Sequence, residues 1–181
     1  MMTLKTRWAE EAMCDLPLPE YPRPQMVREN WINLNGMFDY AITDENAQWC
    51  DEYNEQIRVP FAVESCLSGL CKRVSKKDRM WYRKKVTLPE SFKGKNVILH
   101  FGAVDCISEI YVNGSFAYKN VGGYLPFSID VTKYLSDGEN TVKVIVEDEL
   151  NYDYPCGKQC ENRGGMWYTP VSGIWQTVWL E

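Results

Sequence analysis

The chain has 181 residues, of which 45% are hydrophobic and 25% are charged, and its formal net charge is −5. This length and balance fit one globular domain with a tail, large enough to bury a core without disulfide or metal staples. The net acidity argues against nucleic acid as a partner, and no apolar run approaches the roughly 20 residues that a membrane helix needs.

Residues 1–30 are predicted to form an extended N-terminal arm. Four prolines fall between Pro17 and Pro24, and proline favours extended chain over helix because it lacks the amide hydrogen and fixes φ. Only Trp8 to Met13 has the composition of one short helical turn. We expect the arm to wrap the surface of a domain formed by residues 31–181.

From residue 31 onward the sequence predicts short strands separated by turns. Asn35-Gly36, Asn113-Gly114 and Asp137-Gly138 are turn signals, and Asn-Gly between alternating segments is a strong signal for a hairpin. Many short strands with frequent turns indicate an all-β fold, a sandwich or barrel, and two antiparallel sheets fit this length. The predicted strands are 37–42, 56–61, 80–88, 96–101, 106–112, 115–119, 127–131 and 141–146, with 96–101 in a central position because it is apolar throughout.

A last predicted strand, 174–180, has apolar side chains on both faces. Ile174, Val178 and Leu180 point to one side, whereas Trp175 and Trp179 point to the other, because successive side chains alternate along a strand. The strand should therefore be covered twice. The opposite sheet would cover one face, and the arm or a further domain the other.

The seven cysteines are predicted to be free thiols. Their odd number, and an N-terminus without the apolar core of a signal peptide, favour a cytoplasmic protein over a secreted one. The alternative is a zinc site that uses Cys66 and Cys71 with Cys156 and Cys160, but these spacings depart from the common pattern. In an exported chain, Cys156 and Cys160 would be the first candidates for a disulfide. No metal or other cofactor is predicted.

Candidate catalytic residues are few. Hydrolysis of a glycosidic bond needs two carboxyls roughly 5 to 9.5 Å apart, and Glu147 and Glu149 are predicted on one face of a strand end. A solvated strand end is the favoured interpretation. His100 is the only histidine, so a Ser-His-Asp set would have to use it, yet its apolar strand favours a buried structural role. No catalytic residue is predicted.

The longest stretch without a predicted strand is 150–170. Loops of this length in a compact domain are usually functional or disordered, and the aromatic content of this one disfavours disorder. Its aromatic side chains suit stacking on a sugar ring, and its amide and charged groups suit binding to hydroxyls. The same composition also suits a protein interface or core packing, and all three interpretations stay open. The candidate residues are Lys158, Gln159, Arg163, Trp167 and Tyr168.

Ordered motifs along about 150 residues resemble one known family. They are Arg23-Pro24-Gln25, 31–36 (WINLNG), 59–65 (VPFAVES), 67–69 (LSG), 81–83 (WYR), 99–105 (LHFGAVD), 112–114 (VNG), 122–132 (GGYLPFSIDVT) and 172–176 (SGIWQ). In this order they are similar to the N-terminal domain of glycoside hydrolase family 2.

The resemblance implies a jelly-roll β-sandwich of the galactose-binding-domain-like type. It also implies a parent enzyme that continues into an immunoglobulin-like domain and a (β/α)8 barrel, which would be the partners of this domain together with carbohydrate. Homo-oligomers are a further expectation for such a parent. The family hydrolyses β-galactosides, β-glucuronides, β-mannosides and related bonds with retention, and its catalytic glutamates lie in the barrel.

One segment departs from the family pattern. Members similar to β-galactosidase and β-glucuronidase carry an aspartate that reaches the sugar in the loop before the Gly-Ile step. This chain has Gly164-Gly165-Met166-Trp167 there, so the resemblance leaves the sugar that the parent recognises undefined.

Three hypotheses follow. The favoured one is a non-catalytic accessory domain of a family 2 glycosidase that lends the barrel a loop. The others are a free-standing carbohydrate-binding module and a sandwich used only for protein interaction. A chain that stops on an apolar strand argues against the free-standing module.

Overall fold

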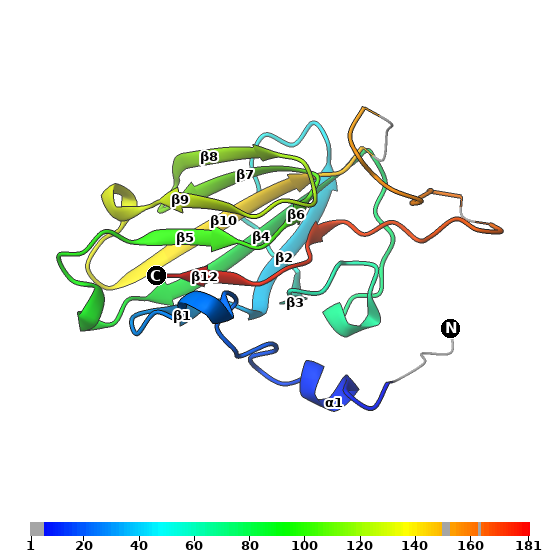
Figure 1. The fold of residues 1–181 in the computed structure, drawn as a ribbon. Helices are drawn as coiled ribbons and strands as arrows, with labels where there is room; N and C mark the ends of the chain where they lie inside the picture. Colours follow the sequence, from blue (N-terminus) through cyan, green and yellow to red (C-terminus); the bar gives the residue numbers. More distant parts are fainter. Residues whose placement is uncertain (1–5, 150–152, 163) are drawn as a thin grey trace.

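The structure is a computed structural model that describes residues 6–149, 153–162 and 164–181. Two antiparallel sheets lie face to face (Figure 1), so the prediction of an all-β sandwich is confirmed. The larger sheet has the strand order β3-β2-β4-β10-β7-β8, the smaller has the order β1-β12-β5-β9, and β11 pairs with β6. No helix in the described part of the chain is long and apolar enough to span a bilayer.

The strands are β1 (Ile32–Asn33), β2 (Gly36–Asp44), β3 (Glu55–Val59), β4 (Asp78–Thr87), β5 (Ile98–Phe101), β6 (Val104–Asp105), β7 (Ile107–Val112), β8 (Ser115–Val121), β9 (Phe127–Asp130), β10 (Glu139–Glu147), β11 (Gly173–Ile174) and β12 (Val178–Leu180). The helical turns are α1 (Ala9–Ala12), η1 (Pro24–Met26), η2 (Cys66–Ser68), η3 (Glu90–Phe92) and η4 (Thr132–Tyr134). The sequence therefore predicts the positions of most strands within a few residues.

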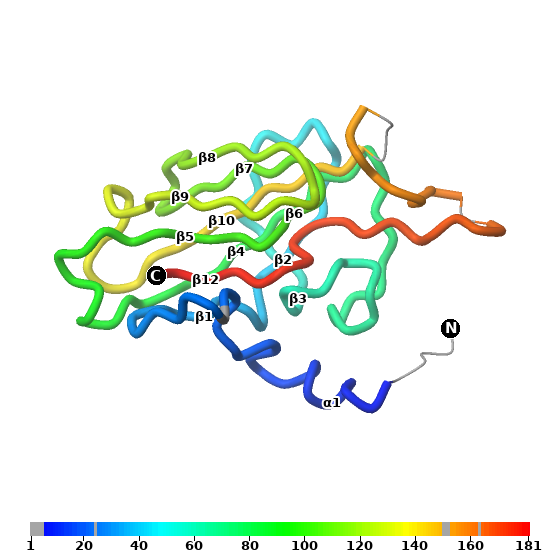
Figure 2. Tube along the Cα trace, viewed as in Figure 1, coloured from blue at the N-terminus to red at the C-terminus, as the bar shows by residue number. Residues whose placement is uncertain are grey.

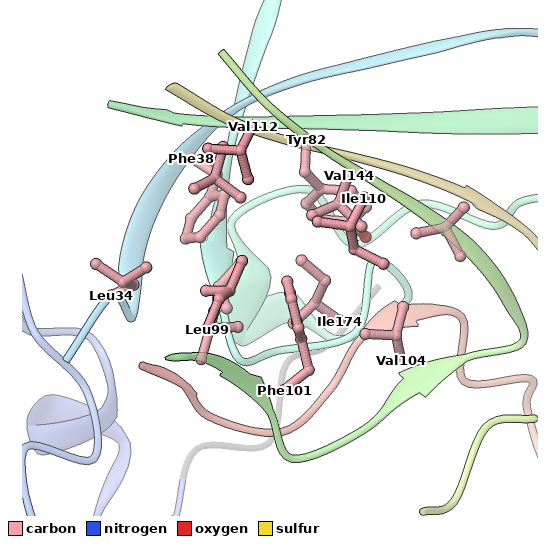
Figure 3. Packing of buried hydrophobic residues seen from close by; sticks show 14 of the residues in the cluster. Leu34, Phe38, Tyr82, Leu99, Phe101, Val104, Ile110, Val112, Val144 and Ile174 are labelled. Atoms are coloured by element: carbon pink, nitrogen blue, oxygen red, sulfur yellow. The ribbon is translucent and has the colours of Figure 1, made fainter. Parts of the chain in front are cut away.

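The core lies between the two sheets and follows from strand alternation. Met80 and Tyr82 of β4 are buried in it, whereas Trp81 between them belongs to a second cluster on the outer face of the larger sheet. Figure 3 shows Tyr82 of the larger sheet on one side of this core and Leu99 and Phe101 of the smaller sheet on the other. Burying side chains of this size stabilises the fold by roughly 1.5 to 3 kcal/mol each.

The Asn113-Gly114 pair forms the hairpin that its sequence predicts, between β7 and β8. Asn113 has a φ of +50° and Gly114 a φ of +79°. A two-residue turn with both central φ values positive matches the twist of the flanking strands.

The last predicted strand is broken into two, which corrects the expectation of one continuous strand over 174–180. β11 pairs with β6, and β12 pairs with β5 and β1. The partner strand is interrupted between Phe101 and Val104 as well, so both strands bend together at this point. Ile174, Val178 and Leu180 still face the core.

The arm covers the other face of β12. Tyr21 and Arg23 both bond the Glu181 carboxylate, and the Arg23 guanidinium lies 5.6 Å from the centre of the Trp179 ring. Trp179 is only 4% exposed as a result. Figure 2 shows this part of the arm, in blue, running beside β1 and β12. The short helical turn predicted within Trp8 to Met13 is present as α1.

The cysteines differ from the prediction at one pair. Cys66 and Cys71 form a disulfide, so the expectation that all seven are free is wrong there. The reason is local: η2 and Gly69, in the left-handed conformation at its C-terminus, fold the segment back on itself and bring the two cysteines together. Cys156 and Cys160 are free thiols, as predicted.

Candidate functional site

The candidate residues that the structure describes, Lys158, Gln159, Trp167 and Tyr168, lie on an excursion of the chain at one end of the sandwich, after β10 and before β11. Figure 1 shows the described parts of this segment, 153–162 and 164–170 (within 153–170, the loop below), projecting in orange beyond the end of the sheets. Its two limbs are tied together, because Gln159 and Tyr168 form a parallel bridge. The Tyr168 amide donates to the Lys158 carbonyl at 2.8 Å, and the Cys160 amide donates to the Tyr168 carbonyl at 3.1 Å.

Most of the candidate side chains on the loop point into solvent. Trp167 is 43% exposed, Tyr168 is 62% exposed, and Lys158 is exposed too. Arg163 lies outside the described residues. Core packing is therefore excluded for Trp167 and Tyr168, whereas a sugar contact and a protein interface both fit their exposure.

The exposed aromatics continue onto the sandwich. Tyr124 and Leu125, in the segment that joins β8 to β9, are 45% and 77% exposed. Tyr124 packs edge-on against Trp175 with 6.2 Å between ring centres. Loop and sandwich together present apolar groups at this end, the kind of surface that marks an interaction site.

Gln159 differs from the other candidates because its amide is bound inside the protein. Its Nε2 donates to the Tyr124 hydroxyl at 3.0 Å, and its Oε1 accepts from the backbone amide of Val171. Gln159 also lines the same small cavity as Asp105. In this structure the side chain holds the loop against the sandwich.

Buried carboxyls lie beneath the loop, and sequence reasoning did not single them out. Asp105 ends β6 and is 5% exposed, and Asp148 follows β10 and is 6% exposed. The Ser172 hydroxyl donates to Asp148 at 2.8 Å, and the Ser172 amide donates to Glu64 at 3.1 Å. Four distant segments therefore bring their polar groups to one end of the sandwich.

Burial sets the protonation of these acids. Burial, followed by the negative charge of Asp148, raises the pKa of Asp105 to about 7, although the hydrogen bond from Gln159 opposes the shift. Burial also raises the pKa of Glu64, against the hydrogen bond from the Ser172 amide. A carboxyl that titrates near neutral pH under a loop is a marker of functional sites.

The arrangement does not resemble a metal centre. Among the residues that the structure describes, no three histidine, cysteine or acidic side chains are grouped so that they would hold a metal ion. The zinc site considered for the cysteines is therefore not formed by the described residues, and Cys66 is in a disulfide with Cys71 instead of ligating a metal.

The acidic pair considered for catalysis is not a pair of facing carboxyls. Glu147 forms an ion pair with Arg79, and Glu149 is exposed. Asp148, between them on the opposite side of the strand, is the acid that points inward. Alternation predicts opposite faces for these neighbours, but the sequence does not say which face is covered.

His100 is buried, as predicted. Its Nδ1 lies 2.7 Å from the Ser128 hydroxyl, its Nε2 lies 3.1 Å from Glu181, and its ring stacks on Trp179. Although serine, histidine and glutamate are in line, they lie on a sheet face where β5 pairs with strands on both sides. The backbone amides there are committed to the sheet and cannot form an oxyanion hole.

The chain is similar in sequence and in fold to known proteins. The family model described as "Glycosyl hydrolases family 2, sugar binding domain" matches residues 71–181. A β-galactosidase of Thermoanaerobacter pseudethanolicus is 34% identical over 156 residues, which are 83% of this chain and 20% of that protein. A putative β-glucuronidase of Formosa agariphila is 25% identical over 86% of this chain and 18% of that protein. The chain thus spans about a fifth of the length of these relatives.

Solved structures show the same fold. A β-glucuronidase of Lactobacillus rhamnosus superimposes with a TM-score of 0.65 at 26% identity, over 86% of this chain and 29% of that one. The β-D-glucuronidase of Dictyoglomus thermophilum gives a TM-score of 0.64 at 25% identity, over 88% of this chain and 29% of the other.

Proposed function

The chain belongs to glycoside hydrolase family 2 as its sugar-binding domain, and from this we propose that it is the non-catalytic N-terminal domain of a longer retaining β-glycosidase. The relatives named β-galactosidase and β-glucuronidase are several times longer than the stretch they share with this chain. In the proposal, the remaining length holds an immunoglobulin-like domain and a catalytic barrel. The barrel supplies both catalytic carboxyls.

The observation that carries the proposal is the exposed aromatic surface of the 153–170 loop. Trp167 and Tyr168 are held at the end of the sandwich by a paired loop but have no cover of their own. Large exposed aromatics on a fixed support suit a contact with another domain or with a sugar. We propose that the loop packs on the barrel and lines one wall of its sugar site.

The loop residues then have separate roles. Trp167 or Tyr168 stacks on an apolar face of the sugar ring, and Lys158 bonds its hydroxyls or a carboxylate. Arg163 has the same proposed role as Lys158 and lies outside the described residues. Gln159 supports the loop from within, because its amide is already bonded to Tyr124 and Val171.

The test is a Trp167→Ala variant of the longer enzyme. Because Trp167 is exposed in this domain, its loss should change the stability of the domain by less than about 0.5 kcal/mol. Loss of a stacking contact in the transition state should lower kcat/KM by roughly 10- to 100-fold. Steady-state kinetics and thermal melting measure both on one sample.

Phe116→Ala is the matched control, since Phe116 is a similarly exposed aromatic on the β8 strand. It should leave kcat/KM unchanged. If Trp167→Ala left kcat/KM unchanged and lowered the melting temperature, Trp167 would be a structural residue and the proposed role of the loop would be wrong.

The alternative, a free-standing carbohydrate-binding module, predicts a different affinity. A loop that forms one wall of a shared site should bind sugars weakly alone, with a Kd of about 1 mM or higher, equivalent to about −4 kcal/mol or weaker. Titration calorimetry of the 181-residue chain with galactosides and glucuronides separates the two. Micromolar binding to the chain alone would favour the module.

A further inference from the structure

The loop is fastened to the sandwich through the side chain of Gln159. One carboxamide bonds the Tyr124 hydroxyl and the Val171 amide, and the same side chain lines a small cavity together with Asp105. The backbone of the same residue pairs with Tyr168. Any shift of the Gln159 side chain is therefore passed to the limb that carries Trp167 and Tyr168.

Asp105 is an acid beside this attachment, and it is only 5% exposed. On the sandwich side, a Cβ built at Gly123 would lie 2.1 Å from Asp105 Oδ1, so the backbone there touches the carboxyl. Asp105, Asp148, Tyr154, Cys156 and Gln159 line one small cavity between the loop and the sandwich.

The other titratable groups around Asp105 come from each element packed against it. Asp148 and Glu149 follow β10, Glu64 lies between β3 and η2, and Cys106 adjoins Asp105 in the chain. Tyr124 lies after β8, and Tyr154 and Cys156 lie on the loop. Asp148 and Glu64 both disfavour a negative charge on Asp105.

We propose that Asp105 and Gln159 are positioning residues that form a proton-sensitive latch, closed on the sandwich while the Asp105 carboxyl is protonated and loosened when it is ionised. A neutral carboxyl sits beside Asp148 without repulsion. An ionised carboxyl in the closed position is a buried anion beside other acids, and such a group is stabilised when water reaches it. The latch concerns this chain alone and holds whether or not the proposed role in a glycosidase is correct.

The direction of the pH effect follows from linkage. In the closed state the pKa of Asp105 is raised to about 7, whereas a solvated aspartate in the open state has a pKa of about 3.9. The closed state binds the extra proton between these values, so closing is favoured at low pH and this advantage is lost as the pH rises through about 7. Between pH 5 and pH 8 the closed-to-open ratio should fall by at most roughly 100-fold.

The experiment is fluorine NMR of the 181-residue chain labelled with 5-fluorotryptophan. The seven tryptophans give separate signals, and Trp167→Phe and Trp175→Phe variants assign the two near the latch. Trp175 is informative because its Nε1 donates to the Gly123 carbonyl at 2.8 Å, next to Asp105. The proposal predicts that the Trp167 and Trp175 signals shift together between pH 5 and pH 8 with a midpoint near 7.

Three variants separate the latch from other causes. Asp105→Asn, which is neutral at every pH, should abolish the shift and keep the low-pH signals up to pH 8. Gln159→Ala should give the high-pH signals throughout. Glu161→Gln removes an exposed acid from the same loop and should titrate like the parent chain.

The proposal would be overturned by constant Trp167 and Trp175 signals in the parent chain, or by an unchanged midpoint in Asp105→Asn. The Trp81 signal, from a fully buried ring on β4, reports whether each variant is folded. If Asp105→Asn fails to fold, Gln159→Ala decides: a parent-like titration in that variant contradicts the latch.

Discussion

Gly173 begins β11 with a φ of +86°, and a Cβ built there would lie 2.0 Å from the Tyr82 hydroxyl. Tyr82 is fully buried in the core, so its ring has little freedom to yield. Backbone conformation and core packing therefore both require glycine at this position.

Gly173→Ala should therefore cost roughly 2 to 4 kcal/mol, from the left-handed backbone and the overlap with Tyr82 together. Gly114→Ala is the matched control, because Gly114 also has a positive φ but its Cβ would meet nothing within 4 Å. It should cost only about 1 kcal/mol. Urea denaturation measures both, and equal losses would show that Tyr82 does not restrict the site.

His100 offers a second test at the scale of one residue, since the chain has no other histidine. Burial lowers the pKa of His100, although the neighbouring Glu181 carboxylate opposes the shift. The neutral form is therefore favoured in the folded state. The stability that the neutral His100 contributes is present above the unfolded-state pKa of about 6.5, and it is lost as the pH falls below that value.

An NMR titration of the single imidazole should give a pKa below 6.5. His100→Asn should make the free energy of unfolding less dependent on pH between 5 and 7. An imidazole pKa at or above 6.5 would mean that Glu181 outweighs burial in this cluster.

Among the elements, the arm and β12 depend on each other. Arg23 bonds Glu181 and lies over Trp179, and the Asn35 side chain joins the Pro17 carbonyl to Thr177. Residues far apart in the sequence thus close one face of the smaller sheet.

Deleting residues 1–24 should expose Trp179, shift tryptophan emission to the red and lower both melting temperature and solubility. Arg23→Ala should reproduce part of the loss, roughly 1 to 3 kcal/mol, because it leaves the half-buried Glu181 carboxylate without its cation. Arg7→Ala is the control, since Arg7 contacts the exposed Trp8. Unchanged emission after the deletion would show that the arm does not cover Trp179.

The strands themselves were predictable from local pattern. Alternation in 141–146 and the turn at Asn113-Gly114 place β10, β7 and β8 correctly, because both signals are local. The break between β11 and β12 was not predictable, since it matches an interruption in β5 and β6 more than 70 residues away. Pairing of that kind is set by tertiary structure and not by the segment's own residues.

At the scale of the whole molecule, the sequence likewise predicts only the part of the candidate site that a local segment forms. The exposed part, Trp167 and Tyr168 with Lys158, stands out in the sequence because aromatic and charged residues gather in one long loop. The buried part does not, since Glu64, Asp105 and Asp148 come from three separate segments that meet only in the folded sandwich. The single signal available was an aspartate at the end of the largely apolar segment 99–105.

The central claim of the proposed function is that this domain is not catalytic by itself, and an activity assay of the chain tests that claim directly. The 181-residue chain, incubated at high concentration with a panel of nitrophenyl β-glycosides, should release no nitrophenol above the buffer rate, because its acids are paired, buried or solvated and the proposal assigns both catalytic carboxyls to a barrel in the longer enzyme. Turnover by the chain that disappears in Glu147→Gln or Glu149→Gln would contradict this account and place a glycosidase site in the sandwich itself.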